Sequence, residues 1–128
     1  MFIDDPVRLH HMLDAAKEAV LFAENRTRID LESDRMLTLS LVKCIEIIGE
    51  AAAWLRHAAR MAGATLRERM TKERQQELPQ IPWPQIISMR NRLIHAYFEI
   101  DLDAVWDTVT EDIPVLIVEL EQIITESE

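Results

Sequence analysis

The residues best suited to chemistry lie in one stretch, Trp83 to Glu99, which contains two arginines, a histidine and the only tyrosine of the chain. At about 100° per residue along a helix, Arg90 falls in the middle of an apolar face. Because burying an unpaired guanidinium is strongly unfavourable, Arg90 must meet a carboxylate, a phosphate or a water-filled crevice. Arginine holds phosphate oxygens bidentately, so phosphate binding is one chemistry that this position predicts.

Asn91 and His95 are four residues apart on the same stretch, so the amide can reach the imidazole and fix its orientation. An imidazole titrates near neutral pH and can act as a general acid or base. Arg90 and His95 differ by about 140° around one helix, so one copy cannot easily aim both at one ligand atom. Two copies packed about a two-fold axis would bring both sets together. The pattern therefore predicts a composite site in a homodimer, with a purely structural pairing of Arg90 to a buried glutamate as the alternative.

Two further clusters have spacings that a metal could use, but neither is complete. His10 and His11 with Asp14 have spacings that a metal could use, but the sequence places no further ligand beside them, which favours a solvated helix face. Glu46 and Glu50 lie four residues apart without the Glu-x-x-His pairs of di-iron bundles. We therefore expect no metal and no cofactor.

The elements that carry these residues are all expected to be helices, because apolar residues recur at helical spacing and no strand alternation appears. The first helix begins at Asp5-Pro6, and the second is capped by Ser33 or Asp34 and ends near Arg60, before Gly63. A polar segment, Thr65 to Glu77, is expected to form a short exposed helix.

The last two helices are separated by a short polar connection. One begins after the proline-rich run that ends at Pro84 and continues to Phe98, and the other is capped by Asp101 and reaches the C-terminus. Pro114 should bend or divide the last helix, because it cannot donate to the Thr110 carbonyl. These elements predict an all-α fold, an antiparallel four-to-five-helix bundle in a single domain over residues 1–128.

Three apolar stripes are expected to form the core of this bundle. They comprise Leu9, Met12, Leu13, Ala16, Val20 and Ala23 in the first helix, Leu37, Leu41, Cys44, Ile45, Ile48, Ala52 and Leu55 in the second, and Leu102, Trp106, Val109, Ile113, Leu116, Ile117, Leu120 and Ile124 in the last.

Composition narrows the possible functions. The chain has 128 residues and only two glycines, which excludes Gly-rich nucleotide-binding loops. The single Cys44 can form neither an internal disulfide nor a four-cysteine zinc site, and no signal peptide or membrane-spanning run is present. We therefore expect a cytoplasmic protein without membrane contact.

Charge is distributed unevenly along the chain. The net charge is −9, but residues 56–92 hold 8 basic and 3 acidic groups, whereas residues 93–128 hold 10 acidic groups and no basic one. Tight, non-specific binding of long nucleic acid is therefore not expected. The segment from Arg56 to Arg74 forms either a local basic patch or a solvated surface of ion pairs.

The stretch from Met89 to Phe98, preceded by Ile81-Pro82-Trp83 and followed by Ile100 to Trp106, closely resembles the HepT-like family of HEPN-domain proteins. Residues 47–52 resemble a second stretch of that family. Together the similar segments run from about Asp34 to Leu120. The sequence departs from many relatives between Trp54 and Gln80, which is longer and richer in arginine.

The resemblance implies a toxin of a toxin–antitoxin pair, a homodimer that cleaves RNA without a metal ion. It places the family's catalytic arginine and histidine on Arg90 and His95, with Asn91 as their polar companion. It also implies a minimal (MntA-like) nucleotidyltransferase antitoxin that transfers AMP to Tyr97. The alternative is a non-catalytic helical dimer that serves only as partner and substrate of the nucleotidyltransferase.

Overall fold

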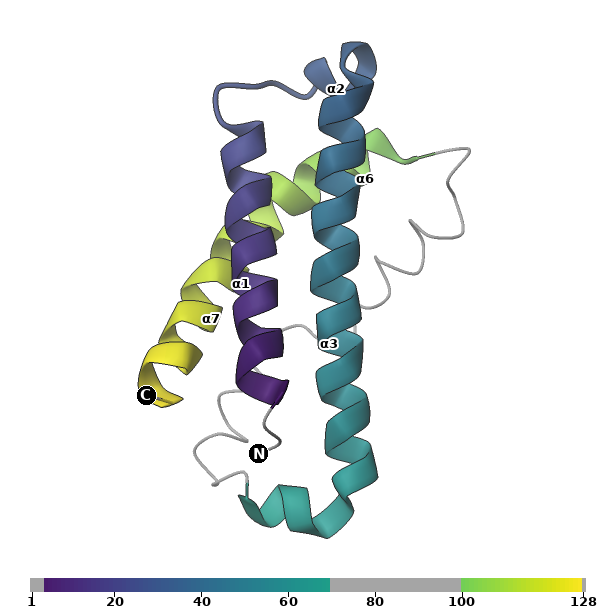
Figure 1. Ribbon diagram of the computed structural model, residues 1–128. Coiled ribbons are helices and arrows are strands. Elements are labelled where there is room, and N and C mark those ends of the chain that lie inside the picture. The colour runs from purple at the N-terminus through teal and green to yellow at the C-terminus, as the bar shows by residue number, and fades with distance from the viewer. Residues whose placement is uncertain (1–3, 70–99, 128) are drawn as a thin grey trace.

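The computed structural model describes the backbone of residues 4–69 and 100–127 (Figure 1). Within these two ranges every regular element is a helix, so the all-α prediction is confirmed. In chain order they are α1 (Asp4–Ala23), α2 (Asp30–Ser33), α3 (Arg35–Arg69), α6 (Leu102–Asp107), the π-helix η2 (Thr108–Asp112) and α7 (Ile113–Ser127). None of the helices in these ranges is long and apolar enough to cross a membrane.

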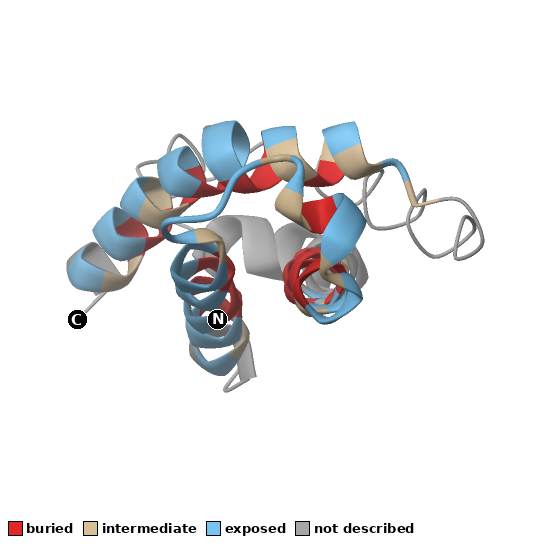
Figure 2. Ribbon diagram, turned by 90° about the horizontal axis from the view of Figure 1, so that it is seen from above, coloured by how far each residue is buried: buried red, intermediate tan, exposed pale blue. Residues whose placement is uncertain are grey.

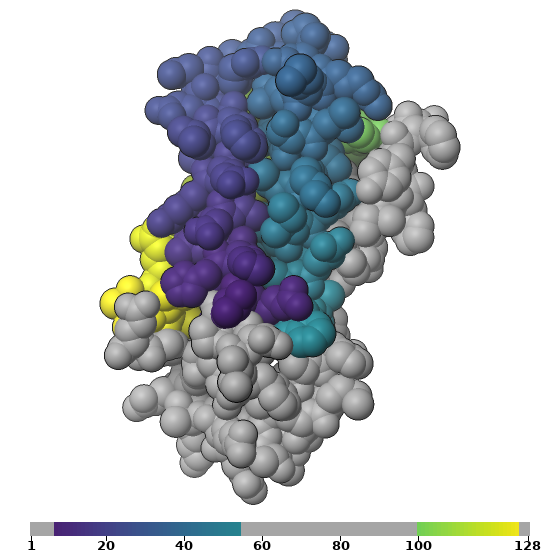
Figure 3. Space-filling view, in the orientation of Figure 1, coloured from purple at the N-terminus to yellow at the C-terminus, as the bar shows by residue number. Residues whose placement is uncertain are grey.

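Helices α1 and α3 lie side by side and run in opposite directions, and the arm formed by α6, η2 and α7 crosses them diagonally (Figure 1). In this arm α6 contacts α3, whereas α7 contacts α1. The buried faces of the three layers point toward one another in the view from above (Figure 2). Seen from the front, the side chains of α1 and α3 form one continuous surface (Figure 3).

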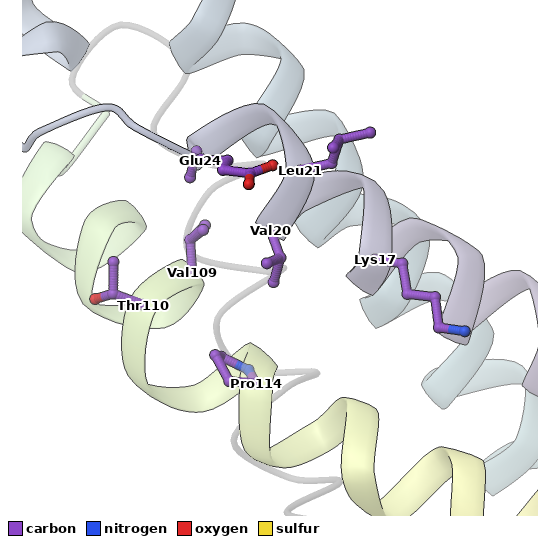
Figure 4. A pocket seen from close by; sticks show the side chains of 8 residues that line it. Lys17, Val20, Leu21, Glu24, Val109, Thr110 and Pro114 are labelled. Atoms are coloured by element: carbon purple, nitrogen blue, oxygen red, sulfur yellow. The ribbon is translucent and has the colours of Figure 1, made fainter.

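Small side chains let α1 approach its neighbours closely. Ala15, Ala16 and Ala19 are almost completely buried, and Met12 fills the space beside them. The prediction that Val20 belongs to the core is wrong, because 38% of its surface is exposed. Val20 lines an open groove between α1 and η2, together with Val109 and Pro114, instead of lying in the core (Figure 4).

Helix α3 extends beyond its predicted end. It continues through Gly63 to Arg69, and Figure 1 shows its last turns running at an angle to the rest. A glycine inside a helix costs only about 1 kcal/mol, and its neighbours here include Ala62 and Ala64, which favour helix strongly. The first residues of the short helix predicted from Thr65 to Glu77 therefore belong to α3, and its remainder lies outside the described residues.

Two aspartates begin helices as the sequence predicts. Asp34 caps α3: its Oδ1 accepts the Leu37 N–H at 3.1 Å, while its Oδ2 accepts from Arg26 at 2.7 Å. The Leu37 N–H and then Arg26 hold the pKa of the Asp34 carboxyl below its usual value. Asp101 caps α6 by accepting the Ala104 N–H at 3.0 Å.

The connection between α1 and α3 contains an element that the sequence analysis missed. The single turn α2 buries Leu31, whose carbonyl accepts the buried Thr38 hydroxyl at 2.8 Å. Arg28 in the same connection pairs with Asp103 of α6 at 2.6 Å. This ion pair links the first half of the chain to the start of the C-terminal arm.

Pro114 divides the last helix, as predicted. The turn before it is a π-helix, in which the Ile113 N–H donates to the Thr108 carbonyl five residues earlier. Because Pro114 has no N–H, it cannot donate to the Thr110 carbonyl, and the register shifts at this point. The arm therefore changes its helical register where it passes the end of α1.

Replacing Asp34 with alanine should lower the melting temperature by roughly 5 °C, because a lost N-cap leaves helix N–H groups unpaired. Since the pKa of Asp34 is lowered in the folded protein, its contribution is present at neutral pH and is lost as the pH falls through that lowered value. Thermal melting followed by circular dichroism at pH 7 and at acid pH checks both statements. Asp14→Ala, at an exposed site within α1, is the matched control. An unchanged melting temperature for Asp34→Ala would contradict the capping role.

Candidate active site and its scaffold

The four residues singled out by the sequence, Arg90, Asn91, His95 and Tyr97, lie outside the described residues, as does the helix predicted over residues 83–98. The described elements on either side of them are the end of α3 and the start of α6. What the structure provides is therefore the scaffold to which the motif is joined at both of its ends.

On the C-terminal side, the motif is followed by residues anchored in the core. Ile100 is half-buried and packs against the core, Asp101 caps α6, and Val105 is completely buried. The side chain of Trp106 also packs against the core. The segment after the motif is therefore fixed by a helix cap and by apolar contacts within six residues of its first anchored position, Ile100 to Val105.

The stretch over residues 47–52 lies in α3 and forms much of its buried face. Ile48, Ala51 and Ala52 are buried and Gly49 is buried with them, whereas Glu50 is exposed. Glu46, one residue before this stretch, is buried, and its carboxylate lies 3.9 Å from the Lys43 ammonium. Because Glu46 is buried and Glu50 is exposed, the two carboxylates do not share one environment.

The other candidate groups of the sequence are found on a solvated face, as expected. His10, His11 and Asp14 are all exposed on α1. Among the residues that the structure describes, no group of three or more His, Cys, Asp and Glu side chains could hold a metal ion.

Cys44 is buried in the core of the described part. Burial, assisted by the charge of Glu18, raises the pKa of its thiol to about 11. A thiol with such a pKa is protonated at neutral pH and is a poor nucleophile. Cys44 therefore belongs to the packing and not to a site.

Glu119 is a feature that the sequence analysis missed. Its Oε2 atom is buried and has no hydrogen-bond partner, and burial raises the pKa of its carboxyl. One sequence signal could have indicated its burial. Around the axis of α7, Glu119 lies about 60° from the apolar stripe of Leu116, Leu120 and Ile123. A carboxylate at the margin of an apolar stripe is half in the core, and its charged form is disfavoured there.

Replacing Glu119 with glutamine should stabilise the protein at neutral pH by less than about 1 kcal/mol, because an uncompensated charge is removed from a partly buried site. The folded protein binds the Glu119 proton more tightly than the unfolded chain does, so the cost of this residue appears as the pH rises above its ordinary pKa. Urea unfolding at neutral pH and near pH 4 measures the difference, which should vanish at the acid end. Glu121→Gln is the control, since Glu121 is exposed and pairs with Lys17 at 3.3 Å. Equal effects of the two substitutions would contradict this account.

Comparison with known proteins places these elements in a family. The family model described as ribonuclease HepT-like matches residues 12–123. The probable ribonuclease HepT of Thermococcus cleftensis is 32% identical over 108 residues, covering 81% of this chain and 84% of that protein. A candidate RNase of Methanocaldococcus jannaschii is 27% identical over 88% of this chain and 90% of its own, and another of Caldanaerobacter subterraneus is 28% identical over 91% and 90%. No solved structure matches the chain at a significant level.

Proposed function

Because the chain belongs to the HepT-like ribonuclease family, we propose that it is the toxin of a toxin–antitoxin pair and cleaves RNA without a metal ion. The observation that carries the proposal is that the family match spans residues 12–123 and so includes the whole Arg-x4-His-x-Tyr motif, Arg90 to Tyr97. The relative from Thermococcus cleftensis, itself a probable ribonuclease, supports the same activity.

Cleavage of RNA without a metal needs a base, an acid and a cation. The base removes the proton of the 2′-hydroxyl, whose oxygen then attacks the adjacent phosphorus; the acid protonates the departing 5′-oxygen. His95 from each of two subunits supplies the base and the acid, and Asn91 orients the imidazole. Arg90 holds the phosphate oxygens and stabilises the charge that develops on them. The products are a 2′,3′-cyclic phosphate and a 5′-hydroxyl, and DNA is spared because it lacks the attacking group.

The distribution of charge supports RNA binding at a surface other than the C-terminal arm. The described part of that arm carries exposed carboxylates and no lysine or arginine; they are Asp101, Asp103, Asp107, Glu111, Asp112 and Glu121. This surface repels a polyphosphate. Residues 56–92, which contain the arginine of the motif, hold 8 basic and 3 acidic groups, so they are the part of the sequence with a net positive charge.

The proposed site is composite, so it requires a homodimer. Light scattering at micromolar concentration should give the mass of two chains. On a helix, Arg90 and His95 would point about 140° apart, so a second copy would be needed to bring both kinds of group to one phosphate. A monomer at every concentration would contradict the composite site.

Replacing His95 with alanine should lower the rate of RNA cleavage by about 10²- to 10⁴-fold, the usual loss when a general acid or base is removed. Cleavage of a labelled RNA by purified protein in EDTA measures the effect, and circular dichroism verifies the helix content. His10→Ala, which removes an exposed histidine from α1, should cleave at the wild-type rate.

Three results would count against this mechanism. His95→Ala could cleave as well as the wild type, it could unfold, or the wild type itself could leave RNA intact. The last result, together with a stable complex with the nucleotidyltransferase, would favour the non-catalytic partner protein instead.

Neutralisation is proposed to occur at Tyr97. Its hydroxyl oxygen attacks the α-phosphorus of ATP on the antitoxin, pyrophosphate leaves, and AMP remains bound to the tyrosine. On a helix Tyr97 lies about 20° from Arg90 and about 10.5 Å further along the axis, on the same side. The added phosphate carries a negative charge beside Arg90, so the nucleotide blocks the RNA by its size and by occupying the arginine.

Co-expression with the nucleotidyltransferase should add whole AMP units to the peptide that contains Tyr97, as measured by mass spectrometry. The modified toxin should lose cleavage activity, because both the space and the cation for the RNA phosphate are taken. Tyr97→Phe should stay unmodified and toxic in the presence of the antitoxin. Neutralisation of an unmodified wild-type protein would refute this mechanism.

A further inference from the structure

Arg8 of α1 and Trp54 of α3 form a contact across the boundary between the two helices. The guanidinium carbon of Arg8 lies 4.6 Å from the centre of the Trp54 ring. At this distance the cation is attracted to the negative face of the ring. The two helices lie side by side and run in opposite directions, so the first turns of α1 meet the second half of α3 (Figure 1).

The core fixes the backbone on both sides of this contact. Leu9, next to Arg8, is buried, and so are Ala51 and Ala52 in the turn of α3 that leads to Trp54. Small buried side chains let two helices approach each other closely. The arginine and the ring are therefore in place before a ligand arrives, and a preorganised site loses less conformational entropy when it binds.

The contact is open to a ligand. Trp54 is 40% exposed, although tryptophan is a residue that proteins bury to a large extent, and Arg8 is half-buried. No carboxylate pairs with Arg8 within the described residues, where its contact is with the ring. An exposed cation–π pair stabilises a fold only slightly. Stability therefore gives little reason to leave an indole and an unneutralised cation together at the surface.

Trp54 lies where the sequence of α3 changes from mixed charge to positive charge. The exposed Glu50 comes one turn before it. From Ala51 to Arg67 the sequence contains three arginines and neither aspartate nor glutamate, and the backbone of α3 continues to Arg69. A polyanion is therefore disfavoured less at this end of α3 than along the acidic C-terminal arm.

An exposed ring beside a cation suits one chemical class of ligand, the nucleotide. Aromatic side chains stack on the base of any nucleotide, and a guanidinium stacks on bases and donates hydrogen bonds to phosphate oxygens. Bases in a duplex are covered by their neighbours, so only an unpaired nucleotide can present its face to the ring. An apolar peptide could cover the indole, but it would supply no anion for Arg8.

We propose that Trp54 and Arg8 bind one unpaired nucleotide of the RNA substrate, with its base on the exposed part of the indole and its phosphate at the guanidinium. This proposal rests on the proposed function, because it takes RNA as the substrate. It adds that the RNA is bound as a single strand at a position outside the Arg90–Tyr97 motif.

Binding of a labelled single-stranded RNA, measured by fluorescence anisotropy, tests the proposal. Methylation of every 2′-oxygen removes the attacking hydroxyl, so wild-type protein can be used without cleavage. Trp54→Leu should weaken binding at least about fivefold, because it removes one stacking ring but keeps an apolar side chain. Trp54→Phe should retain most of the affinity, and Arg8→Gln should weaken binding as well. Phe22→Leu is the matched control, since Phe22 is an aromatic residue of α1 with a similar exposure of 41%.

A duplex of the same sequence tests whether the ring contacts an unpaired base. Wild-type protein should bind the single strand at least about fivefold more tightly than the duplex, and Trp54→Leu should lose most of this preference. The Arg8→Gln and Trp54→Leu effects should be non-additive in the double variant, because both groups bind the same nucleotide. Circular dichroism verifies the helix content of each variant. If Trp54→Leu disturbs the packing, Arg8→Gln and Trp54→Phe carry the test.

Three results would overturn the proposal. Trp54→Leu and Arg8→Gln could bind the single strand like the wild type, Phe22→Leu could weaken binding as much as Trp54→Leu, or the wild type could prefer the duplex. Cleavage of unmodified RNA, on which Trp54→Leu should act mainly through KM, keeps the two proposals apart. Binding that depends on Trp54 without cleavage preserves the nucleotide site and removes the nuclease. Cleavage that is unchanged in Trp54→Leu preserves the nuclease and removes the nucleotide site.

Discussion

The close approach of α1 to α3 and α7 is the constraint on which the rest of the described structure depends. It is possible because Ala15, Ala16 and Ala19 are nearly free of solvent and leave room for larger neighbours. Met12 and Leu41, both fully buried, belong to the same core, so truncating either would leave a cavity there. The arm formed by α6, η2 and α7 crosses this helix pair diagonally, so that α6 contacts α3 and α7 contacts α1. The capped start of α6, and with it Ile100, is held against the core by that crossing.

Two ion pairs connect the first half of the chain to the acidic C-terminal arm formed by α6, η2 and α7. Lys17–Glu121 and Arg28–Asp103 connect the first half of the chain to the arm, but both pairs are largely exposed and contribute little to stability. The described part of the arm carries exposed carboxylates and no lysine or arginine.

Local signals in the sequence were sufficient for two helix caps and for the break in the last helix. Asp34 and Asp101 precede apolar runs and cap the helices after them, and Pro114 breaks the helix that contains it. The misses have a local cause at Gly63 and a tertiary cause at Val20 and Glu119. Gly63 does not end α3, because the helix formers around it outweigh its cost. Val20 is partly exposed, because it lines an open groove beside η2. The buried oxygen of Glu119 depends on which elements surround α7, which periodicity alone does not give. The placement of Arg90 and His95, which lie outside the described residues, stays a prediction.

The most direct measurement is cleavage, in EDTA, of an RNA that carries a single 2′-deoxy nucleotide at its main cleavage site. If the 2′-hydroxyl is the nucleophile, the unmodified RNA is cut and leaves a 2′,3′-cyclic phosphate, whereas the substituted RNA stays intact at that position. Cleavage at the deoxy position, or activity only after a divalent metal ion is added, would contradict the account.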